Sequence, residues 1–273
     1  MVNDLMEGQI VENWDDLGED IVDWIRNYAN SNQITTLVIG VSGGIDSAVT
    51  STLCAKTGLN TMVINMPINQ QKTQYDLANK HIKWLKSKWM NVQSHVINLD
   101  GTYDFFSNED MHNFKLSNLA LANTRARLRM TTLYAIAGSN KGIVVGTGNK
   151  VEDFGVGFFT KYGDGGVDIS PIADLYKSEV YELADILDII QEIQKAAPTD
   201  GLWDDDRTDE DQMGATYEEL EWAMSELENS SEEKLNENQK KVLEIYRGLN
   251  TANSHKMNPI PVFRKNNTNQ TEE

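Results

Sequence analysis

A loop of small residues, Gly40 to Ser47, has the composition of a phosphate-binding site. It follows a β-branched run at 34–41 and precedes a helical stretch at 48–56. A strand that ends in glycines at the start of a helix presents main-chain N–H groups to an anion, because the first N–H groups of a helix have no partner within it. The loop lacks both the lysine of GxxxxGK[ST] and the spacing of GxGxxG. It therefore predicts a phosphate site of another kind.

Asp46 indicates which kind, because a carboxylate inside such a loop repels a nucleotide unless a divalent cation lies between the two charges. Mg²⁺ is commonly held by one or two carboxylates together with substrate phosphate oxygens. Ser42 and Ser47 add hydroxyl donors for the other phosphate oxygens. The alternative is a plain helix N-cap with two turn glycines. The strand in front of the loop favours a magnesium–nucleotide site.

Alternating strands and helices are expected to position these residues. Apolar runs predict strands at 34–41, 61–66, 92–99 and 141–146, and helical spacing predicts helices at 11–29, 48–56, 75–89 and 116–137. Strands joined by helices of this length pair in parallel. We expect an α/β fold with a doubly wound parallel sheet covered by helices on both faces. Its ligands would bind beyond the carboxyl ends of the strands.

The second half of the chain changes in character. Its glycines predict an irregular loop over 154–168. They lie at 155, 157, 163, 165 and 166, with one more just upstream at 148. Further helices are expected at 175–190, 217–227 and 236–249. We expect a single domain over 1–273, with an N-terminal helix in 1–33, a mobile acidic segment at 199–235 and a frayed tail at 265–273.

Composition excludes several classes of protein. The chain has 24 Lys and Arg against 42 Asp and Glu, a net charge of −18, which disfavours nucleic acid and anionic membranes as partners. Its apolar runs are shorter than the roughly 20 residues of a membrane span. The first residues of the chain show no basic region followed by an apolar stretch, the pattern of a secretory signal. Cys54 is the only cysteine, which rules out an internal disulfide. We expect a cytoplasmic protein.

The stretch Ser42-Gly43-Gly44-Ile45-Asp46-Ser47 resembles the pyrophosphate loop SGGxDS of the N-type ATP pyrophosphatases. That superfamily includes NAD, GMP, asparagine and argininosuccinate synthetases. The resemblance implies that a substrate oxygen attacks the α-phosphorus of ATP and that pyrophosphate leaves into this loop. A nitrogen nucleophile then displaces AMP.

Five other stretches resemble, in order and spacing, the ammonia-dependent NAD synthetases; they are 123–130, 146–152, 157–168 (GFFTKYGDGGVD), 197–202 and 254–256. The similarity spans about 34–256, nearly the whole chain. It implies an adenine nucleotide α-hydrolase-like fold. It also implies an ATP-dependent amidation of deamido-NAD (nicotinic acid adenine dinucleotide) by ammonia, which gives NAD, AMP and pyrophosphate through an acyl-adenylate.

The resemblance also implies roles for single residues. The expected ATP contacts are Gly40, Val41, Ser42, Gly43, Gly44, Ile45, Asp46, Ser47, Thr147, Lys177 and Thr199. The expected Mg²⁺ ligands are Asp46 and Glu152, and the expected deamido-NAD contacts are Arg127, Phe159, Lys161, Asp168, His255 and Lys256. Asp164 matches the acid beside the ammonia, and the catalytic set is Asp46, Lys161, Asp164 and Lys177.

Several of these residues have plainer alternatives. Arg125 and Arg129, four positions apart on a helix, can simply face water, and Asp164 and Asp168 can be turn formers beside glycine. For Phe158 and Phe159 we expect one to anchor the loop in the core and the other to stack on a nucleotide ring. Asp153 competes with Glu152 as metal ligand, because this chain has one more residue here than the commonest family pattern. The loop at 65–72 receives no adenine contact, because it lacks a basic residue that many relatives carry there.

The resemblance also bears on the oligomeric state and the nitrogen donor, and two rival functions remain. Family members are homodimers whose deamido-NAD site lies at the interface, so the same is expected here. The chain has no amidotransferase domain, so free ammonia is the expected donor, although a partner chain that supplies it stays open. The rival functions are another N-type pyrophosphatase that amidates a different acid and a non-catalytic nucleotide-binding module of the same fold.

Overall fold

The core of the molecule is a parallel sheet of four strands. The structure, a computed structural model, describes residues 13–199, 201–202, 207–227 and 235–264. The strands lie in the order β3-β2-β1-β4 and all pair in parallel, with bounds Thr36–Gly40 (β1), Asn60–Asn65 (β2), Val92–Val96 (β3) and Gly142–Val144 (β4). The four predicted strands are confirmed: β1, β3 and β4 are shorter than their apolar runs, and β2 is shifted by one residue.

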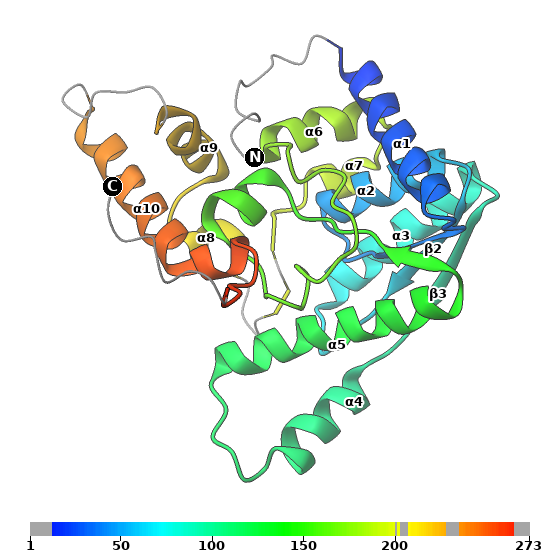
Figure 1. Cartoon of the computed structure of the whole chain (residues 1–273), viewed down its shortest axis with the longest axis horizontal. Helices are drawn as coiled ribbons and strands as arrows, with labels where there is room; N and C mark the ends of the chain where they lie inside the picture. The colour runs from blue at the N-terminus through cyan, green and yellow to red at the C-terminus, as the bar shows by residue number, and fades with distance from the viewer. Residues whose placement is uncertain (1–12, 200, 203–206, 228–234, 265–273) are drawn as a thin grey trace.

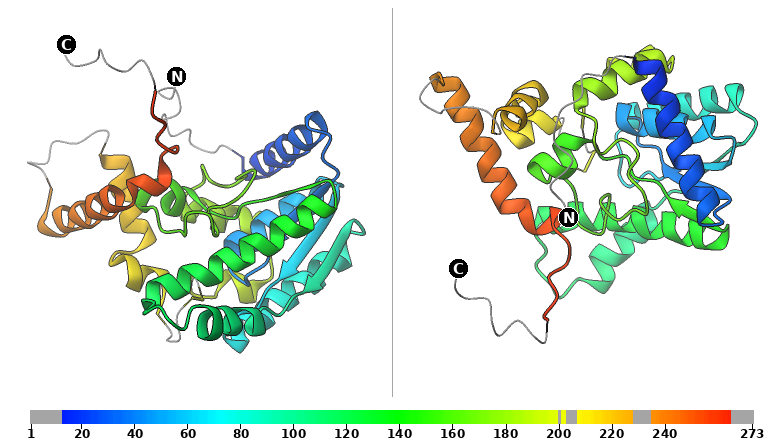
Figure 2. Two further views of the ribbon diagram at one scale, coloured as in Figure 1. Left: turned by 60° about the horizontal axis from the view of Figure 1, so that its bottom comes forward. Right: turned by 45° about the horizontal axis from the view of Figure 1, so that its top comes forward.

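Helices cover both faces of the sheet, as predicted (Figures 1 and 2). Side chains of a strand alternate between faces: Leu37 and Ile39 of β1 pack in one apolar cluster with residues of α1, α2 and α6, whereas Val38 packs in another with α5. The bounds are Trp14–Ser31 (α1), Ile45–Lys56 (α2), Lys72–Lys88 (α3), Asn118–Ser139 (α5) and Lys177–Ile186 (α6). The alternation explains why β1 reads as a continuous apolar run rather than as polar and apolar in turn.

Beside the sheet lies a further apolar cluster, which we call the C-terminal lobe. It consists of Val151–Val156 (η2, a π-helix), Asp209–Met213 (α8), Tyr217–Glu226 (α9) and Glu237–Met257 (α10). Figure 1 shows α9 and α10 side by side at the edge opposite β3. The lobe is built around fully buried side chains such as Leu220 and Val156.

Four sequence predictions differ from the structure in this half of the chain, whereas the helix expected at 217–227 is confirmed as α9. The irregular loop expected over 154–168 begins inside η2. The helix expected at 236–249 continues to Met257, and the one expected at 175–190 ends at Ile186, before a short helix Gln191–Gln194 (α7). The acidic segment expected over 199–235 also contains α8, which the sequence did not predict, and Asp209 and Met213 are buried. Residues 200, 203–206, 228–234 and the tail 265–273 lie outside the described residues.

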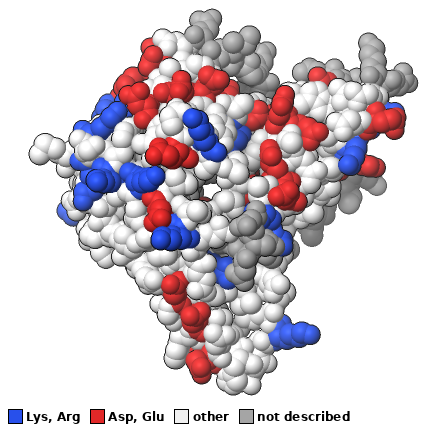
Figure 3. Space-filling model, turned by 180° about the vertical axis from the view of Figure 1, so that it is seen from behind, with Lys and Arg blue, Asp and Glu red and all other residues white. Residues whose placement is uncertain are grey.

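The short helices Asp100–Phe105 (α4) and Phe106–Asp110 (η1) precede α5 and were not predicted. They lie beneath α5 in the view of Figure 1. In that part of the chain that is described, no helix is both long and apolar enough to cross a membrane. On the face seen in Figure 3, acidic side chains gather along the upper edge and basic ones form smaller groups between them.

Candidate active site

A cavity of about 250 Å³ opens at the carboxyl ends of β1 and β4. Strand order places it there, because the chain runs from β1 through β2 to β3 on one side and then returns to form β4 on the other side of β1. Ligands of open α/β sheets bind at such a switch point. The lining comes from the loops after β1 and β4, from α5 and α6, and from segments 158–167 and 196–202. Of the predicted site residues it includes Gly40, Val41, Ser42, Gly44, Ile45, Asp46, Ser47, Thr147, Glu152, Phe159, Asp164, Lys177 and Thr199.

The loop after β1 is closed by its two serines. Their hydroxyl oxygens lie 3.1 Å apart, and Ser47 Oγ donates to the carbonyl of Gly44 at 2.9 Å. Gly43 has φ +96°, and a Cβ there would lie 2.6 Å from the carbonyl oxygen of Gln74, so only glycine fits. Gly44 is the N-cap of α2 without a side-chain cap. The arrangement leaves the first turn of α2 facing the cavity, as an anion site requires.

Lys177, at the start of α6, is buried and lies between two carboxylates. Its Nζ donates to Asp46 Oδ2 at 2.5 Å and to Glu152 Oε1 at 3.3 Å, and only 3% of the side chain is exposed. Burial lowers the pKa of Lys177, but Asp46 and Glu152 raise it by more, so the net pKa lies above its ordinary value. The lysine therefore stays charged, and it joins residues that are more than 100 positions apart in sequence.

Two further side chains hold these carboxylates. Asn149 Nδ2 donates to Asp46 Oδ1 at 3.1 Å, and Tyr217 Oη donates to Glu152 Oε1 at 2.6 Å. The Tyr217 ring also lies 4.7 Å from Lys177 Nζ. Sequence reasoning missed both residues. Asn149 lies in a stretch used for the resemblance, whereas Tyr217 reads as one apolar position of an amphipathic helix, so no sequence signal marks it.

Asp153 lies beside this group without contacting Lys177 directly. Its carboxylate packs on Gly148, where a Cβ would lie 2.3 Å from both carboxylate oxygens. Burial, followed by Glu152, Asp164 and Asp46, raises the pKa of Asp153 to about 8. Of the two candidates for the second metal ligand, the structure turns Glu152 toward Lys177 and Asp46 and places Asp153 against the glycine.

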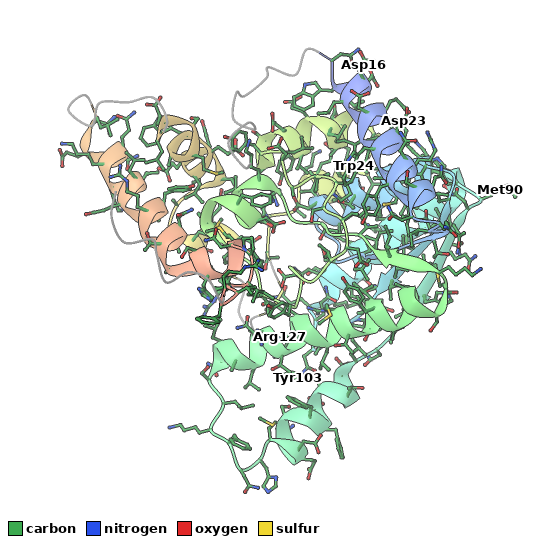
Figure 4. The ribbon with its side chains drawn as sticks, viewed as in Figure 1. Asp16, Asp23, Trp24, Met90, Tyr103 and Arg127 are labelled. Carbon is green, nitrogen blue, oxygen red and sulfur yellow. The ribbon has the colours of Figure 1, made fainter. Side chains whose placement is uncertain are left out.

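The other predicted cations gather beside the loop 157–166 and are not among the residues that line the cavity. Arg127 Nη2 donates to the carbonyl of Lys161 at 3.2 Å, Lys161 Nζ to that of His255 at 2.5 Å, and Lys256 Nζ to that of Phe159 at 2.8 Å. The structure thus brings together α5, the glycine-rich loop and the end of α10, which the sequence separates widely. Figure 4 labels Arg127 on α5, near the centre of the molecule.

The remaining predicted residues divide by their contacts. Asp164 Oδ1 accepts from the Thr160 N–H at 3.0 Å, as a turn former does, and also lines the cavity. Asp168 accepts from Tyr134 Oη at 3.0 Å and from the Val144 N–H at 2.8 Å and is not among the cavity-lining residues. Phe158 packs against the C-terminal lobe, and both Phe158 and Phe159 line the cavity. That one of the two stacks on a nucleotide ring stays a prediction.

Arg125 and Arg129 do not simply face water. Arg125 is buried, its Nη1 donates to the carbonyl of Leu202 at 2.9 Å, and it stacks 5.0 Å from the ring of Tyr103 on α4. Arg129 lines the cavity and donates to the carbonyl of Met66 at 3.0 Å. The two arginines therefore tie α5 to the segment around Leu202 and to the end of β2.

The donor set suits Mg²⁺ in combination with a nucleotide but not alone. Among the described residues no group of three His, Cys, Asp or Glu side chains could hold a metal by itself. Asp46 and Glu152 provide two carboxylates that both contact the ammonium group of Lys177. Mg²⁺ is typically held by one or two carboxylates, and phosphate oxygens complete its coordination shell. The residues present therefore fit a magnesium ion that arrives with its nucleotide.

A sequence model of the family described as NAD synthase matches residues 17–260. The chain belongs to this family. An NH(3)-dependent NAD(+) synthetase of Carboxydothermus hydrogenoformans is 38% identical over 223 residues, 81% of this chain and 89% of the relative. The family assignment confirms the resemblance seen in the sequence, and the chain is an enzyme of the ligase class to which NAD synthases belong.

Solved structures of the NAD synthase fold agree with the architecture. The NMN synthetase of Francisella tularensis superposes with a TM-score of 0.81 at 33% identity and covers 92% of this chain and 98% of its own. The NH3-dependent NAD synthetase of Campylobacter jejuni gives a TM-score of 0.74 at 26% identity, with 92% and 100% covered. The expected α/β fold is thereby confirmed.

Proposed function

We propose that this chain amidates deamido-NAD with ammonia at the expense of ATP and releases NAD, AMP and pyrophosphate. The observation that carries the proposal is the position of the buried Lys177, which joins Asp46 of the glycine loop and Glu152 of η2 at the end of the cavity where the phosphates of ATP would lie. The family and its relatives support the reaction.

In the first step, the nicotinate carboxylate attacks the α-phosphorus of ATP. Pyrophosphate leaves toward the N–H groups of the loop after β1 and the ammonium group of Lys177, which stabilise the charge that develops on it. Mg²⁺, when bound with ATP at Asp46 and Glu152, supplies further charge neutralisation of the phosphates. Thr147 and Thr199 line the same cavity and are assigned to ATP.

In the second step, ammonia attacks the acyl-adenylate and AMP departs. The proton that ammonium must lose goes to a carboxylate near the cavity, and Asp164, which lines it, is assigned to this place. The loop 157–166 and the segment around Leu202 enclose the cavity and exclude water from the hydrolysable intermediate. Phe159, Lys161, Arg127, His255 and Lys256 are assigned to deamido-NAD, together with Asp168.

A second acid substrate has a specific observation in its favour. The structure with a TM-score of 0.81 is that of an NMN synthetase, so the mononucleotide that corresponds to NMN, nicotinic acid mononucleotide, is the alternative to deamido-NAD. Both acids carry the same reacting carboxylate, and they differ in whether an adenylate half has to be bound.

The test is a single assay of the purified protein with ATP, Mg²⁺, either acid, and either ammonium or glutamine. We expect AMP and NAD to form together from deamido-NAD and ammonium, with a higher kcat/KM than for the mononucleotide and with no product from glutamine. A higher kcat/KM for nicotinic acid mononucleotide would show that this mononucleotide, and not deamido-NAD, is the preferred acid substrate. ATP binding without product from either acid would favour the rival function, a non-catalytic nucleotide-binding module.

We also infer that the enzyme works in the cytoplasm as a homodimer. Its negative net charge and the family assignment are compatible with a cytoplasmic enzyme. Three large apolar side chains around α4 and α5, namely Phe105, Phe114 and Leu119, are more than half exposed. Apolar surface of this kind favours a partner face on this side of the molecule.

A further inference from the structure

One face of α9 reaches the active site at two points. Tyr217 and Glu221, four residues apart, lie on the same side of the helix. Tyr217 Oη donates to Glu152 Oε1 at 2.6 Å, and Glu221 accepts from the Ser178 N–H at 2.9 Å and from Ser178 Oγ at 2.6 Å. Because Ser178 follows Lys177, α9 holds both the carboxylate and the segment that carries the lysine.

The hydroxyl group of Tyr217 has a defined partner. Glu152 Oε1 lies at 2.6 Å and Asp209 Oδ2 at 3.4 Å, and since a phenol has one proton, the shorter contact is the one to which it donates. Tyr217 is 6% exposed. Burial, followed by Glu152, Asp209 and Asp46, raises the pKa of Tyr217 far above its ordinary value, so the hydroxyl remains a donor.

Glu152 needs the contact with Tyr217 because Lys177 lies closer to Asp46 than to Glu152. The ammonium group lies 2.5 Å from Asp46 and 3.3 Å from Glu152, so the lysine alone fixes the glutamate weakly. A glutamate side chain has three rotatable bonds, and it keeps one orientation only when groups around it restrict them. Tyr217 provides that restriction from a different element.

We propose that Tyr217 is a positioning residue for the amidation reaction: its hydroxyl group fixes the carboxylate of Glu152 and so prepares it for the Mg²⁺ ion that accompanies ATP. This rests on the proposed function. Partners of this kind behind a metal ligand typically change metal affinity by about 10- to 100-fold when they are removed. The role also couples α9, and through it the C-terminal lobe, to the phosphate end of the cavity.

The test compares Tyr217→Phe with Tyr246→Phe in the full-length protein. Both tyrosines are buried in the same apolar cluster, and only the first contacts Glu152. We expect Tyr217→Phe to raise the Mg²⁺ concentration needed for half-maximal ATP binding by about tenfold. That binding is measured by calorimetry without the acid substrate and so without turnover. The KM for deamido-NAD and the melting temperature should change little, and Tyr246→Phe should behave as wild type.

A double-mutant cycle with Glu152→Ala identifies the group through which Tyr217 acts. If it acts through Glu152, adding Tyr217→Phe to Glu152→Ala produces no further rise in the Mg²⁺ requirement. Additive effects, or a single variant indistinguishable from wild type, would overturn the proposal. Should Tyr217→Phe fold poorly, Tyr217→Leu replaces it with the same expected result. Absence of amidated product from the wild-type protein would instead count against the proposed function.

Discussion

Two regions of the candidate site hold their cations in different ways. At the phosphate end of the cavity, Lys177 is buried and contacts Asp46 and Glu152 through its side chain. Beside the loop 157–166, which we call the outer end of the site, Lys161 and Lys256 donate to main-chain carbonyls of neighbouring segments and do not line the cavity. The first arrangement joins opposite charges away from water, whereas the second joins a charge to a neutral dipole nearer the surface.

This difference teaches how each end can receive an anion. A buried ammonium group between carboxylates keeps its place with or without ligand, because breaking such a pair leaves a buried charge uncompensated. A lysine that donates to a carbonyl exchanges that partner for a phosphate or carboxylate at a small net cost, since hydrogen bonds between charged groups are the stronger ones. The phosphate end is thus prepared in advance, and the outer end adapts to the substrate.

The largest effect is expected from Lys177→Met, which removes the charge at the prepared end but keeps the length of the side chain. Turnover should fall by about 100- to 1,000-fold, as when a donor to a developing anion is lost. The free energy of unfolding should fall by about 3 kcal/mol, because Asp46 and Glu152 would face one another without the cation. Steady-state kinetics and urea denaturation measure the two losses.

The matched control for this substitution is Lys150→Met. Lys150 pairs with the largely exposed Asp174, and removal of such a pair should change the free energy of unfolding by less than about 1 kcal/mol. Equal losses of stability in the two variants would contradict the conclusion that the buried pairs of Lys177 are worth more than a pair with an exposed carboxylate.

A smaller and more selective effect is expected from Lys161→Ala at the outer end. Loss of one charged contact with the substrate should raise the KM for deamido-NAD by about tenfold, which corresponds to about 1.4 kcal/mol. The KM for ATP should change by less than about twofold, and the melting temperature should stay close to wild type, because Lys161 donates only to the His255 carbonyl in the described contacts. Equal rises of both KM values would remove the assignment of Lys161 to deamido-NAD.

At neutral pH the smallest effect is expected at the support behind the phosphate loop, because this effect appears only in acid. His81 of α3 is buried, and its Nε2 lies 2.9 Å from Ser51 Oγ on α2. Burial lowers the pKa of His81 to about 3, while a backbone hydrogen bond with Ala48 opposes this shift. The folded state therefore holds this histidine neutral at pH values at which the unfolded chain protonates it.

Stability from this group is complete above the unfolded pKa of 6.5 and is lost as the pH falls toward about 3. The free energy of unfolding should fall by about 1.4 kcal/mol for each pH unit below 6.5 from this one proton. Urea denaturation of wild type and His81→Gln at several pH values should show the steeper dependence in wild type. His95→Gln, at an exposed position of β3, should keep the wild-type slope.

The central strands of the sheet were predictable because they are buried on both sides. β1 and β2 appear in the sequence as apolar β-branched runs, and their parallel pairing follows from the helix between them. The C-terminal lobe was harder to predict for a physical reason. α8 begins at Asp209, and its sequence DEDQM looks like an exposed acidic stretch, although Asp209 and Met213 are buried. Tertiary packing outweighs composition in so short a helix.

The candidate site likewise contains residues that the sequence predicts and residues that it does not. Asp46 was predicted from a motif and Lys177 from the family resemblance, and the structure brings the two side chains together. For Arg125 the sequence left open that it simply faces water, but the residue is buried against Tyr103 and Leu202, which are remote in sequence. Tyr217 was missed for the same reason, since its partner Glu152 lies 65 positions away. Contacts between distant segments leave no spacing in the sequence.

The close approach of Gly148 to Asp153 has a consequence for how this protein can vary. Any side chain at position 148 would collide with both carboxylate oxygens of Asp153. A lineage that gained even a methyl group there would have to shorten or remove the acid five residues later before the fold tolerated it. The two positions are therefore a linked pair, and changes at one should be accepted only in company with changes at the other.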